Sequence, residues 1–170
     1  EVYNRTPLEP DAGWMEFYET LAGQAAIAIE NDEMFERLER ALADLTSAYD
    51  STLEGWVRAL DLRDKETIGH TQRVAMMVVG FALELGVSGD DLVNIRRGAL
   101  LHDIGKMGIP DEILNKAGPL TDDERLIIQR HPQYAYELLR PIHYLGAAMD
   151  IPYAHHERWD GKGYPRGLKG

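Results

Sequence analysis

Mostly apolar side chains recur at alternating spacings of three and four residues along the first third of the chain. The positions are Phe35, Leu38, Leu42, Leu45, Tyr49, Thr52, Trp56 and Ala59. This seven-residue repeat, flanked by charged residues such as Glu36 and Arg40, is typical of a coiled-coil seam. From residue 13 to about 62 only Gly23 and Gly55 weaken the helical pattern. We therefore expect one long helix here, after a strand at Glu1–Asn4 and a proline-marked turn.

Two interpretations of the repeat are open. The stripe either packs on the chain's own core or pairs with the same stripe of a second copy. A helix of fifty residues at about 1.5 Å per residue is about 75 Å long, more than one small domain can cover. The length favours a parallel dimeric coiled coil.

The remaining sequence is also helical by period, and several ends are marked. Residues 70–85 follow a helical pattern that stops at Gly86, a natural C-cap. Further helices are expected from Ser88 to His102, from the capping box of Thr121 and Glu124, from Pro132 to Leu139, and over residues 146–156. The fold class is therefore all-α, a helical bundle behind a long helix.

The net charge is unevenly distributed. Residues 1–50 contain twelve acidic and three basic residues, and residues 51–170 contain seventeen and fifteen. The formal charge of −11 therefore divides into −9 and −2. The second part is nearly neutral and has no basic stripe, so duplex nucleic acid is not expected as a partner.

The chain of 170 residues contains no cysteine. It also has no apolar run of the roughly 20 residues that a membrane span requires. These features predict about one domain, or one domain and part of another, in the cytoplasm and without membrane contact.

Two short stretches carry the candidate chemistry. Leu101–Lys106 places His102 before Asp103, with Lys106 three residues later, and residues 155–165 place two histidines before a glycine-rich loop. Imidazole and carboxylate are the ligands of hydrolytic transition-metal sites, and no thiols are present for a structural zinc site. A metal-dependent phosphoesterase is the function that these residues favour.

Other residues widen the candidate ligand set. Glu66 and His70 are four residues apart and would share a helix face. His131 stands at a helix break before a proline, and His155 and His156 are adjacent. Taken singly, Glu66 and His70 are better explained as a solvated pair and His131 as a capping or core histidine, whereas the adjacent histidines are stronger evidence, since burying two imidazoles without a purpose is costly. Together these residues favour metal binding. The ions compatible with this set are iron, manganese, zinc and nickel.

Lys106 and the glycine-rich loop each have two interpretations. Lys106 would neutralise a phosphate oxygen or would simply complement a helix C-terminus. Tyr164, between Gly163 and Pro165, would stack on a base or donate to a phosphate, unless the segment is only a surface loop.

These motifs resemble the HD-GYP family, a branch of the HD superfamily of metal-dependent phosphohydrolases, over residues 52–170. The resemblance rests on residues 102–106, on His131-Pro132 and on the run from His155 to Gly170. Residues 1–40 are similar to the last strand and closing helix of a GAF sensor domain. The expected organisation is a GAF-like end at 1–34, a coiled-coil linker at 35–62 and an HD-GYP domain at 63–170.

The resemblance implies hydrolysis of cyclic di-GMP to linear pGpG, and sometimes on to GMP, at two or three divalent metals, commonly iron or manganese. The implied ligands are His70, His102, Asp103, His131, His155 and His156, with Glu66 as the ligand of three-metal members. Asp103 and Lys106 would be catalytic. Lys106 and the Gly163-Tyr164-Pro165 loop would bind substrate.

The family's domain continues past the loop with a further aspartate ligand, whereas this sequence ends at Gly170. Weak or absent catalysis is therefore expected of this chain alone. A homodimer through the long helix would carry a signal from the GAF sensor. The alternatives are a catalytically silent receptor or docking module for cyclic di-GMP or a diguanylate cyclase (GGDEF) partner, and an HD phosphohydrolase acting on another nucleotide.

Overall fold

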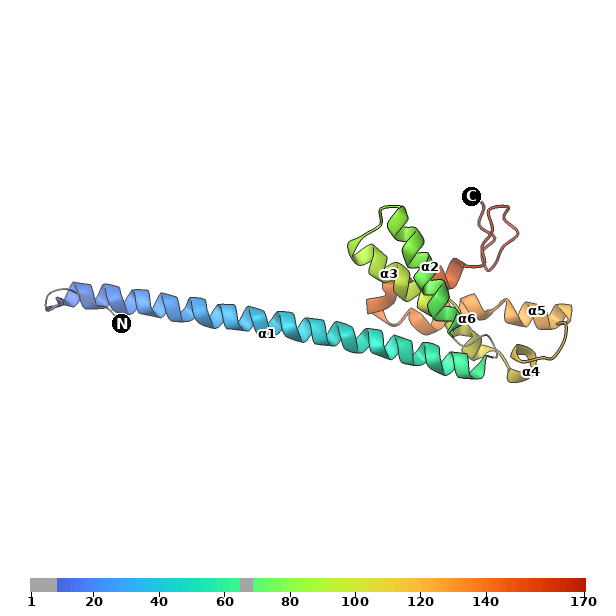
Figure 1. Cartoon of the computed structure of the whole chain (residues 1–170), viewed down its shortest axis with the longest axis horizontal. Coiled ribbons are helices and arrows are strands. Elements are labelled where there is room, and N and C mark those ends of the chain that lie inside the picture. Colours follow the sequence, from blue (N-terminus) through green and yellow to red (C-terminus); the bar gives the residue numbers. More distant parts are fainter. Residues whose placement is uncertain (1–8, 65–68) are drawn as a thin grey trace. The chain divides into compact units, whose positions relative to one another are not determined.

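A computed structural model describes residues 9–64 and 69–170, which divide into an N-terminal unit (residues 1–48) and a C-terminal unit (residues 49–170). Figure 1 shows the helices of each unit. Over the described ranges the regular structure is helical, with one isolated bridge between Asp160 and Lys169. The all-α fold class is confirmed. The strand expected at Glu1–Asn4 lies outside the described residues.

The first helix is as long as the repeat predicts. Helix α1 runs over Ala12–Arg63, and Asp11 caps its start by accepting a hydrogen bond from the Trp14 amide at 2.7 Å. Within the N-terminal unit, the apolar positions of the repeat are exposed to solvent, Leu38 and Leu42 each by 63%. The single helix of this unit leaves that seam uncovered by its own residues.

In the C-terminal unit, α1 packs through residues beside the repeat. Leu53, Val57 and Leu60 are buried, whereas Trp56 and Ala59 of the repeat are exposed. Trp56 and Ala59 therefore do not enter the core, although Tyr49 of the repeat stacks on Tyr144, which packs against it. The core takes the neighbouring face of the helix.

The other helices form the rest of the C-terminal unit. They are α2 (His70–Glu84), α3 (Gly89–Leu101), the 3-10 helix η1 (Ile104–Gly108), α4 (Asp111–Leu114), α5 (Asp122–Ile128), α6 (His131–Leu139), the 3-10 helix η2 (His143–Ala148) and α7 (Asp150–Ala154). Two hydrophobic clusters hold them together. One contains Leu53, Leu101, Ile104, Ala135, Leu139 and Leu145, and the other contains Val57, Ala75, Ala99 and Leu100.

Most predicted helix ends are confirmed. Thr121 and Glu124 form a full capping box at the start of α5, and Pro132 lies in the first turn of α6. The single helix expected over residues 146–156 is wrong, because the chain forms η2 and then α7. Pro152 has no amide hydrogen to donate to the carbonyl of Ala148 and is tolerated only in a first turn, so α7 begins at Asp150.

The 3-10 helix η1 packs tightly against α6 at Gly105. A Cβ atom at this position would lie 1.8 Å from the His131 carbonyl oxygen and 2.6 Å from the Ala135 amide nitrogen. Only glycine allows the two backbones to approach this closely. The contact places the segment that follows Asp103 directly beside the start of α6.

Gly105→Ala is therefore expected to destabilise the chain by about 3 kcal/mol, because backbone atoms rather than a flexible side chain must move. Urea denaturation followed by circular dichroism measures this. Gly80→Ala in α2 is the matched control, since no atom lies within 4 Å of its Cβ position. The control should gain about 0.5–1 kcal/mol. Equal stabilities of the two variants would contradict the close contact.

None of the helices in the described ranges is both long and apolar enough to cross a membrane.

Candidate metal centre

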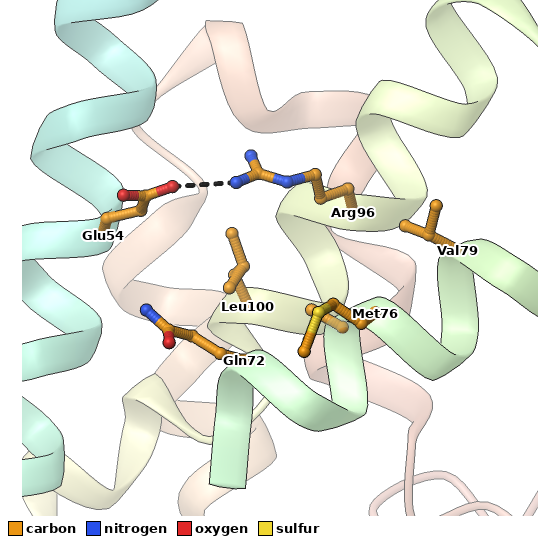
Figure 2. A pocket seen from close by; sticks show the side chains of 7 residues that line it. Glu54, Gln72, Met76, Val79, Arg96 and Leu100 are labelled. Carbon is orange, nitrogen blue, oxygen red and sulfur yellow. Dashed lines mark hydrogen bonds and ion pairs between the residues drawn. The ribbon is translucent and has the colours of Figure 1, made fainter. Parts of the chain in front are cut away.

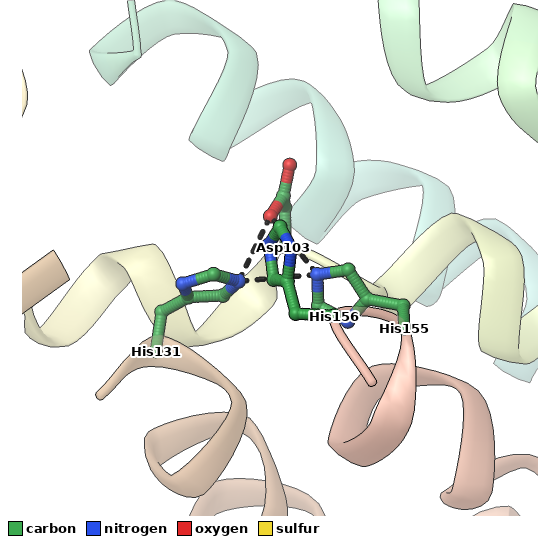
Figure 3. A group of neighbouring side chains, drawn as sticks. All are labelled: Asp103, His131, His155 and His156. Atoms are coloured by element: carbon green, nitrogen blue, oxygen red, sulfur yellow. Dashed lines mark hydrogen bonds and ion pairs between the residues drawn. The ribbon is translucent and has the colours of Figure 1, made fainter. Parts of the chain in front are cut away.

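Asp103, His131, His155 and His156 meet in the C-terminal unit with one ligand atom each, all within 4.8 Å of one another (Figure 3). Asp103 lies between α3 and η1, His131 is the first residue of α6, and the histidine pair follows α7. Asp103 and His131 are buried, and His155 and His156 are half-buried. Three separate segments thus deliver nitrogen and oxygen ligands to one place.

Backbone carbonyls determine which nitrogen of each histidine faces the cluster. Nδ1 of His131 lies 2.8 Å from the Ile128 carbonyl oxygen, and Nδ1 of His155 lies 3.1 Å from that of Pro152. A carbonyl oxygen can only accept, so both Nδ1 atoms carry the proton. In the neutral rings Nε2 then holds the lone pair, which is the usual arrangement of metal-binding histidines.

The two Nε2 atoms point at each other. They are 3.1 Å apart, and that of His131 lies 3.3 Å from Oδ1 of Asp103. Two facing lone pairs repel unless a proton or a metal cation lies between them. Nitrogen and carboxylate ligands suit divalent transition ions, so the residues present fit such a metal.

The pKa values favour neutral imidazoles at this place. Burial lowers the pKa of His131 and of His156, and burial together with the neighbouring histidines lowers the pKa of His155 to about 4. All three rings are therefore neutral near pH 7 and available as ligands without first losing a proton.

These shifts predict how the stability of the metal-free chain depends on pH. In the unfolded chain these histidines bind protons below about pH 6.5, whereas in the folded chain their lowered pKa values delay protonation to lower pH. Stability is then fully present above that pH and falls as the pH drops towards about 4. His102, whose pKa is raised, contributes the opposite trend but is outnumbered.

Urea denaturation of the chelator-treated chain should therefore show about 1–3 kcal/mol less stability at pH 5 than at pH 7.5. His155→Gln is the comparison, because glutamine does not titrate and the variant should depend less on pH. A flat profile for the original chain would contradict the prediction.

Asp103 is also the centre of a charged group. Its Oδ2 lies 3.0 Å from Nε2 of His102 and 3.0 Å from Nζ of Lys106, and Lys106 also donates to Asp64 at 2.9 Å. Burial raises the pKa of Asp103, but His102 and Lys106 outweigh burial and hold that pKa well below its usual range. Burial likewise lowers the pKa of His102, and the hydrogen bond and charge of Asp103 outweigh it and raise that pKa. Asp103 is thus a carboxylate at neutral pH.

Two other candidate ligands border the cluster without joining it. The ring centroid of His102 lies 5.1 Å from that of His155, and the centroid of His70 lies 6.4 Å from that of His102. Glu66, the remaining candidate, lies outside the described residues. His102 contacts Oδ2 of Asp103, whereas His131 contacts Oδ1.

The glycine-rich loop covers the cluster with an aromatic ring. Tyr164 stacks on His156 with centroids 4.6 Å apart and planes 20° apart. A Cβ at Gly163 would lie 2.4–2.5 Å from the Arg158 nitrogen, the Glu157 Cα and the His156 oxygen, so the turn requires glycine. Pro165 follows Tyr164 through a cis peptide bond.

Sequence analysis missed two carboxylates that order the site. Glu157 accepts the Arg166 and Leu168 amides at 2.7 and 2.8 Å and so holds the loop closed on itself. Asp64 holds Lys106. Glu157 directly follows the paired histidines, a position that could have suggested its role; nothing near Asp64 in the sequence points to Lys106.

Two cavities of the C-terminal unit differ in their relation to the cluster. One of about 490 Å³ is lined by Lys106, Asp64, Asn115 and Lys116 among others, and so adjoins the cluster through Lys106. The other, of about 330 Å³, lies among α1, α2 and α3 (Figure 2). Its lining contains apolar side chains and the ion pair of Glu54 and Arg96, in which Oε1 and Nη2 are 2.8 Å apart. None of the residues that line this cavity belongs to the cluster. Only the first cavity is placed to serve the site.

The site thus combines one aspartate with histidines from later segments of a helical domain. The family model described as "HD domain" matches residues 56–170. The chain belongs to the HD domain family, and its motifs place it in the HD-GYP branch.

Relatives with assigned activities agree with this membership. A cyclic di-GMP phosphodiesterase of Thermotoga maritima is 42% identical over 140 residues, which are 78% of this chain and 38% of the relative. The cyclic di-GMP phosphodiesterase response regulator RpfG of Xanthomonas campestris is 36% identical over 149 residues, 86% of this chain and 38% of the relative. The 3'3'-cGAMP-specific phosphodiesterase 3 of Vibrio cholerae is 35% identical over 151 residues, 88% of this chain and 33% of the relative. The chain spans between a third and two fifths of the length of these proteins.

Proposed function

We propose that this chain contains the metal-binding core of a phosphodiesterase that hydrolyses cyclic di-GMP. The observation that carries the proposal is the pair of facing Nε2 atoms of His131 and His155, 3.1 Å apart beside the carboxylate of Asp103. Family membership and the activities named for the relatives support the same reaction class.

In this proposal, Asp103, His131, His155 and His156 are metal ligands, and His70 and His102 extend the ligand set. Glu66 belongs to the set if three metals are held. When bound, divalent iron or manganese supplies Lewis-acid activation of water and of the phosphodiester. Nε2 of His102 contacts Oδ2 of Asp103 at 3.0 Å, so both atoms would be available as ligands only once this contact is given up.

Lys106 is the proposed catalytic cation. Its ammonium is 12% exposed and is held between Asp64 and Asp103, both at about 3 Å. In the reaction, a water oxygen bonds to phosphorus, the bond to the 3′-oxygen breaks and that oxygen takes up a proton, which gives linear pGpG. Lys106 would neutralise negative charge on the non-bridging oxygens as it develops.

The substrate would reach this point from the glycine-rich loop and the cavity at Lys106. The ring of Tyr164 stacks on His156 and is a surface on which a guanine base can stack when the loop moves away from His156. Gly163 and Pro165 set the loop path. The cavity of about 490 Å³ adds two lysines and an amide for phosphate and base contacts.

A second candidate substrate is 3'3'-cGAMP, because a relative 35% identical to this chain is named as specific for it. The two cyclic dinucleotides differ in one base. The silent receptor is the other alternative, and the retained ligand cluster argues against it, because a nucleotide receptor has no need of facing imidazole lone pairs.

Control by an upstream GAF-like domain is part of the proposal, through a homodimer of α1. The exposed seam of Phe35, Leu38, Leu42 and Leu45 supports dimer formation, since apolar side chains at coiled-coil spacing gain by pairing. A GGDEF protein remains a further proposed partner.

The experiment that tests the function measures metal content and turnover after purification without oxygen. It uses this chain and a longer one that extends beyond residue 170, with cyclic di-GMP and 3'3'-cGAMP as substrates. Bound iron or manganese with release of pGpG from the longer chain supports the proposal. If the longer chain binds metal and a cyclic dinucleotide but does not hydrolyse the nucleotide, the receptor function replaces the phosphodiesterase proposal. If it hydrolyses 3'3'-cGAMP in preference to cyclic di-GMP, 3'3'-cGAMP becomes the proposed substrate.

A further inference from the structure

The C-terminal end of α1 contacts the segment that carries Asp103 and Lys106. The Arg63 guanidinium donates to the carbonyl oxygens of Lys106 at 3.3 Å, Met107 at 2.7 Å and Ile109 at 2.6 Å. It also pairs with the carboxylate of Asp111 at 2.8 Å. One side chain of α1 thus reaches the backbone of η1 and of the turn that follows it.

The carbonyls at the end of η1 gain a partner in this way, although that of Lys106 also accepts the Ile109 amide at 3.0 Å. The last carbonyls of a helix have no partner within the helix, and a 3-10 helix of five residues holds its own hydrogen bonds weakly. A cation at a helix C-terminus is also favoured by the helix dipole. Arg63 therefore caps η1 at the end opposite Asp103, which is the N-cap of the same helix.

Asp64, the next residue, acts on the side chain of the same loop. Its Oδ2 lies 2.9 Å from Nζ of Lys106, which lies 3.0 Å from Oδ2 of Asp103. The three side chains are 11–12% exposed, so water screens the pairs little. The last residue of α1 and the residue that follows it thus hold both the backbone and the side chain of Lys106.

We propose that Arg63 and Asp64 form a two-point clamp that positions Asp103 and Lys106. Arg63 orders the backbone of residues 106–109, and Asp64 sets the direction of the Lys106 ammonium towards Asp103. Neither residue is among the proposed metal ligands, and both are positioning residues, although Asp64 also lines the cavity at Lys106. The inference rests on the proposed metal site. It implies that a displacement of α1 would alter that site through the contacts of Arg63 and Asp64.

Geometry distinguishes a clamp from a surface contact. Arg63 bonds three backbone acceptors with the planar fork of its guanidinium, an arrangement that the single ammonium of lysine cannot reproduce. Asn115 in turn donates to the Arg63 carbonyl at 3.2 Å, which fixes the helix end that carries the guanidinium. The arginine is held at its backbone and binds with its side chain.

The test measures Mn²⁺ affinity by calorimetry on the metal-free chain and hydrogen exchange at residues 104–109. Arg63→Gln should lower the affinity about tenfold, as expected for residues that orient ligands. It should also speed exchange of these amides about tenfold relative to those of α2. Arg63→Lys should fall between Arg63→Gln and the original chain.

Arg58→Gln is the matched control, because Arg58 is an exposed arginine one turn earlier on α1. It should leave both readouts unchanged. Asp64→Asn should also lower Mn²⁺ affinity, because the ammonium of Lys106 would then pair with Asp103 without its second carboxylate and would compete with the ion for Asp103. The double variant Arg63→Gln/Asp64→Asn should lose less than the product of the two losses, because both residues hold the same segment.

The original affinity and exchange in a folded Arg63→Gln would overturn the clamp, as would an equal loss in Arg58→Gln. If Arg63→Gln does not fold, Arg63→Lys decides by the same criteria. A chain that binds no Mn²⁺ at all would instead overturn the proposed metal site. The exchange rates at residues 104–109 would still decide for or against the clamp.

Discussion

Asp103→Asn is expected to abolish metal binding and to lower phosphodiester turnover by about 10³-fold or more. The carboxylate is the one anion among the four clustered ligands, and it also pairs with His102 and Lys106. Asparagine keeps the shape of the side chain but removes the charge, so the ion would lose its anionic ligand while Lys106 kept its pair with Asp64. Metal analysis and turnover of the longer chain measure both effects.

Asp90→Asn is the control for this variant, because Asp90 is an exposed acid in the first turn of α3, the helix that leads to Asp103. It should retain metal and turnover. Full metal content in Asp103→Asn would show that histidines alone hold the ion and would contradict the central place given to this carboxylate.

Lys106→Met is expected to keep the metal and to lower kcat about 10²-fold. The methionine side chain fills similar space but provides no charge for the phosphate oxygens, and the loss of one such donor has an effect of this size. Steady-state kinetics with parallel metal analysis measures the result. The carboxylates of Asp64 and Asp103 would lose their shared cation, so the metal affinity should stay the same or increase.

Lys116→Met supplies the comparison, because Lys116 lines the same cavity as Lys106 but pairs with Glu124, outside the cluster. It should change KM more than kcat. If Lys106→Met lost metal as Asp103→Asn does, the lysine would be a structural support of the ligands, and its catalytic role would be wrong.

Much of the secondary structure could be predicted because its causes are local. Helix α1 follows from a repeat written over neighbouring turns, and the capping box of Thr121 and Glu124 satisfies amides three residues away. Pro132 marks the first turn of α6 for the same local reason. Apolar periodicity predicted one helix across Pro152, but Pro152 has no amide hydrogen and is tolerated only in a first turn. The chain therefore forms two shorter helices there.

Most residues of the candidate metal site could also be predicted, since imidazole and carboxylate groups are metal ligands wherever the fold brings them together. The sequence indicated His131 and the pair His155 and His156 as partners of Asp103, and the folded chain brings these four together. His70 and His102, which the sequence named in the same ligand set, lie beside this group, whereas nothing in the sequence analysis indicated that Glu157 would hold the loop.

The sequence by itself determined the all-α class, the long first helix, the main caps and the residue types of the site, all of which depend on neighbours within a few positions. Tertiary structure alone decided which face of α1 is buried, how closely Gly105 brings η1 onto α6, and that Arg63 and Asp64 reach residues more than forty positions away. Such contacts depend on how several helices pack at once. A side chain's distant partners are set by the summed geometry of the core, and no local pattern records that geometry.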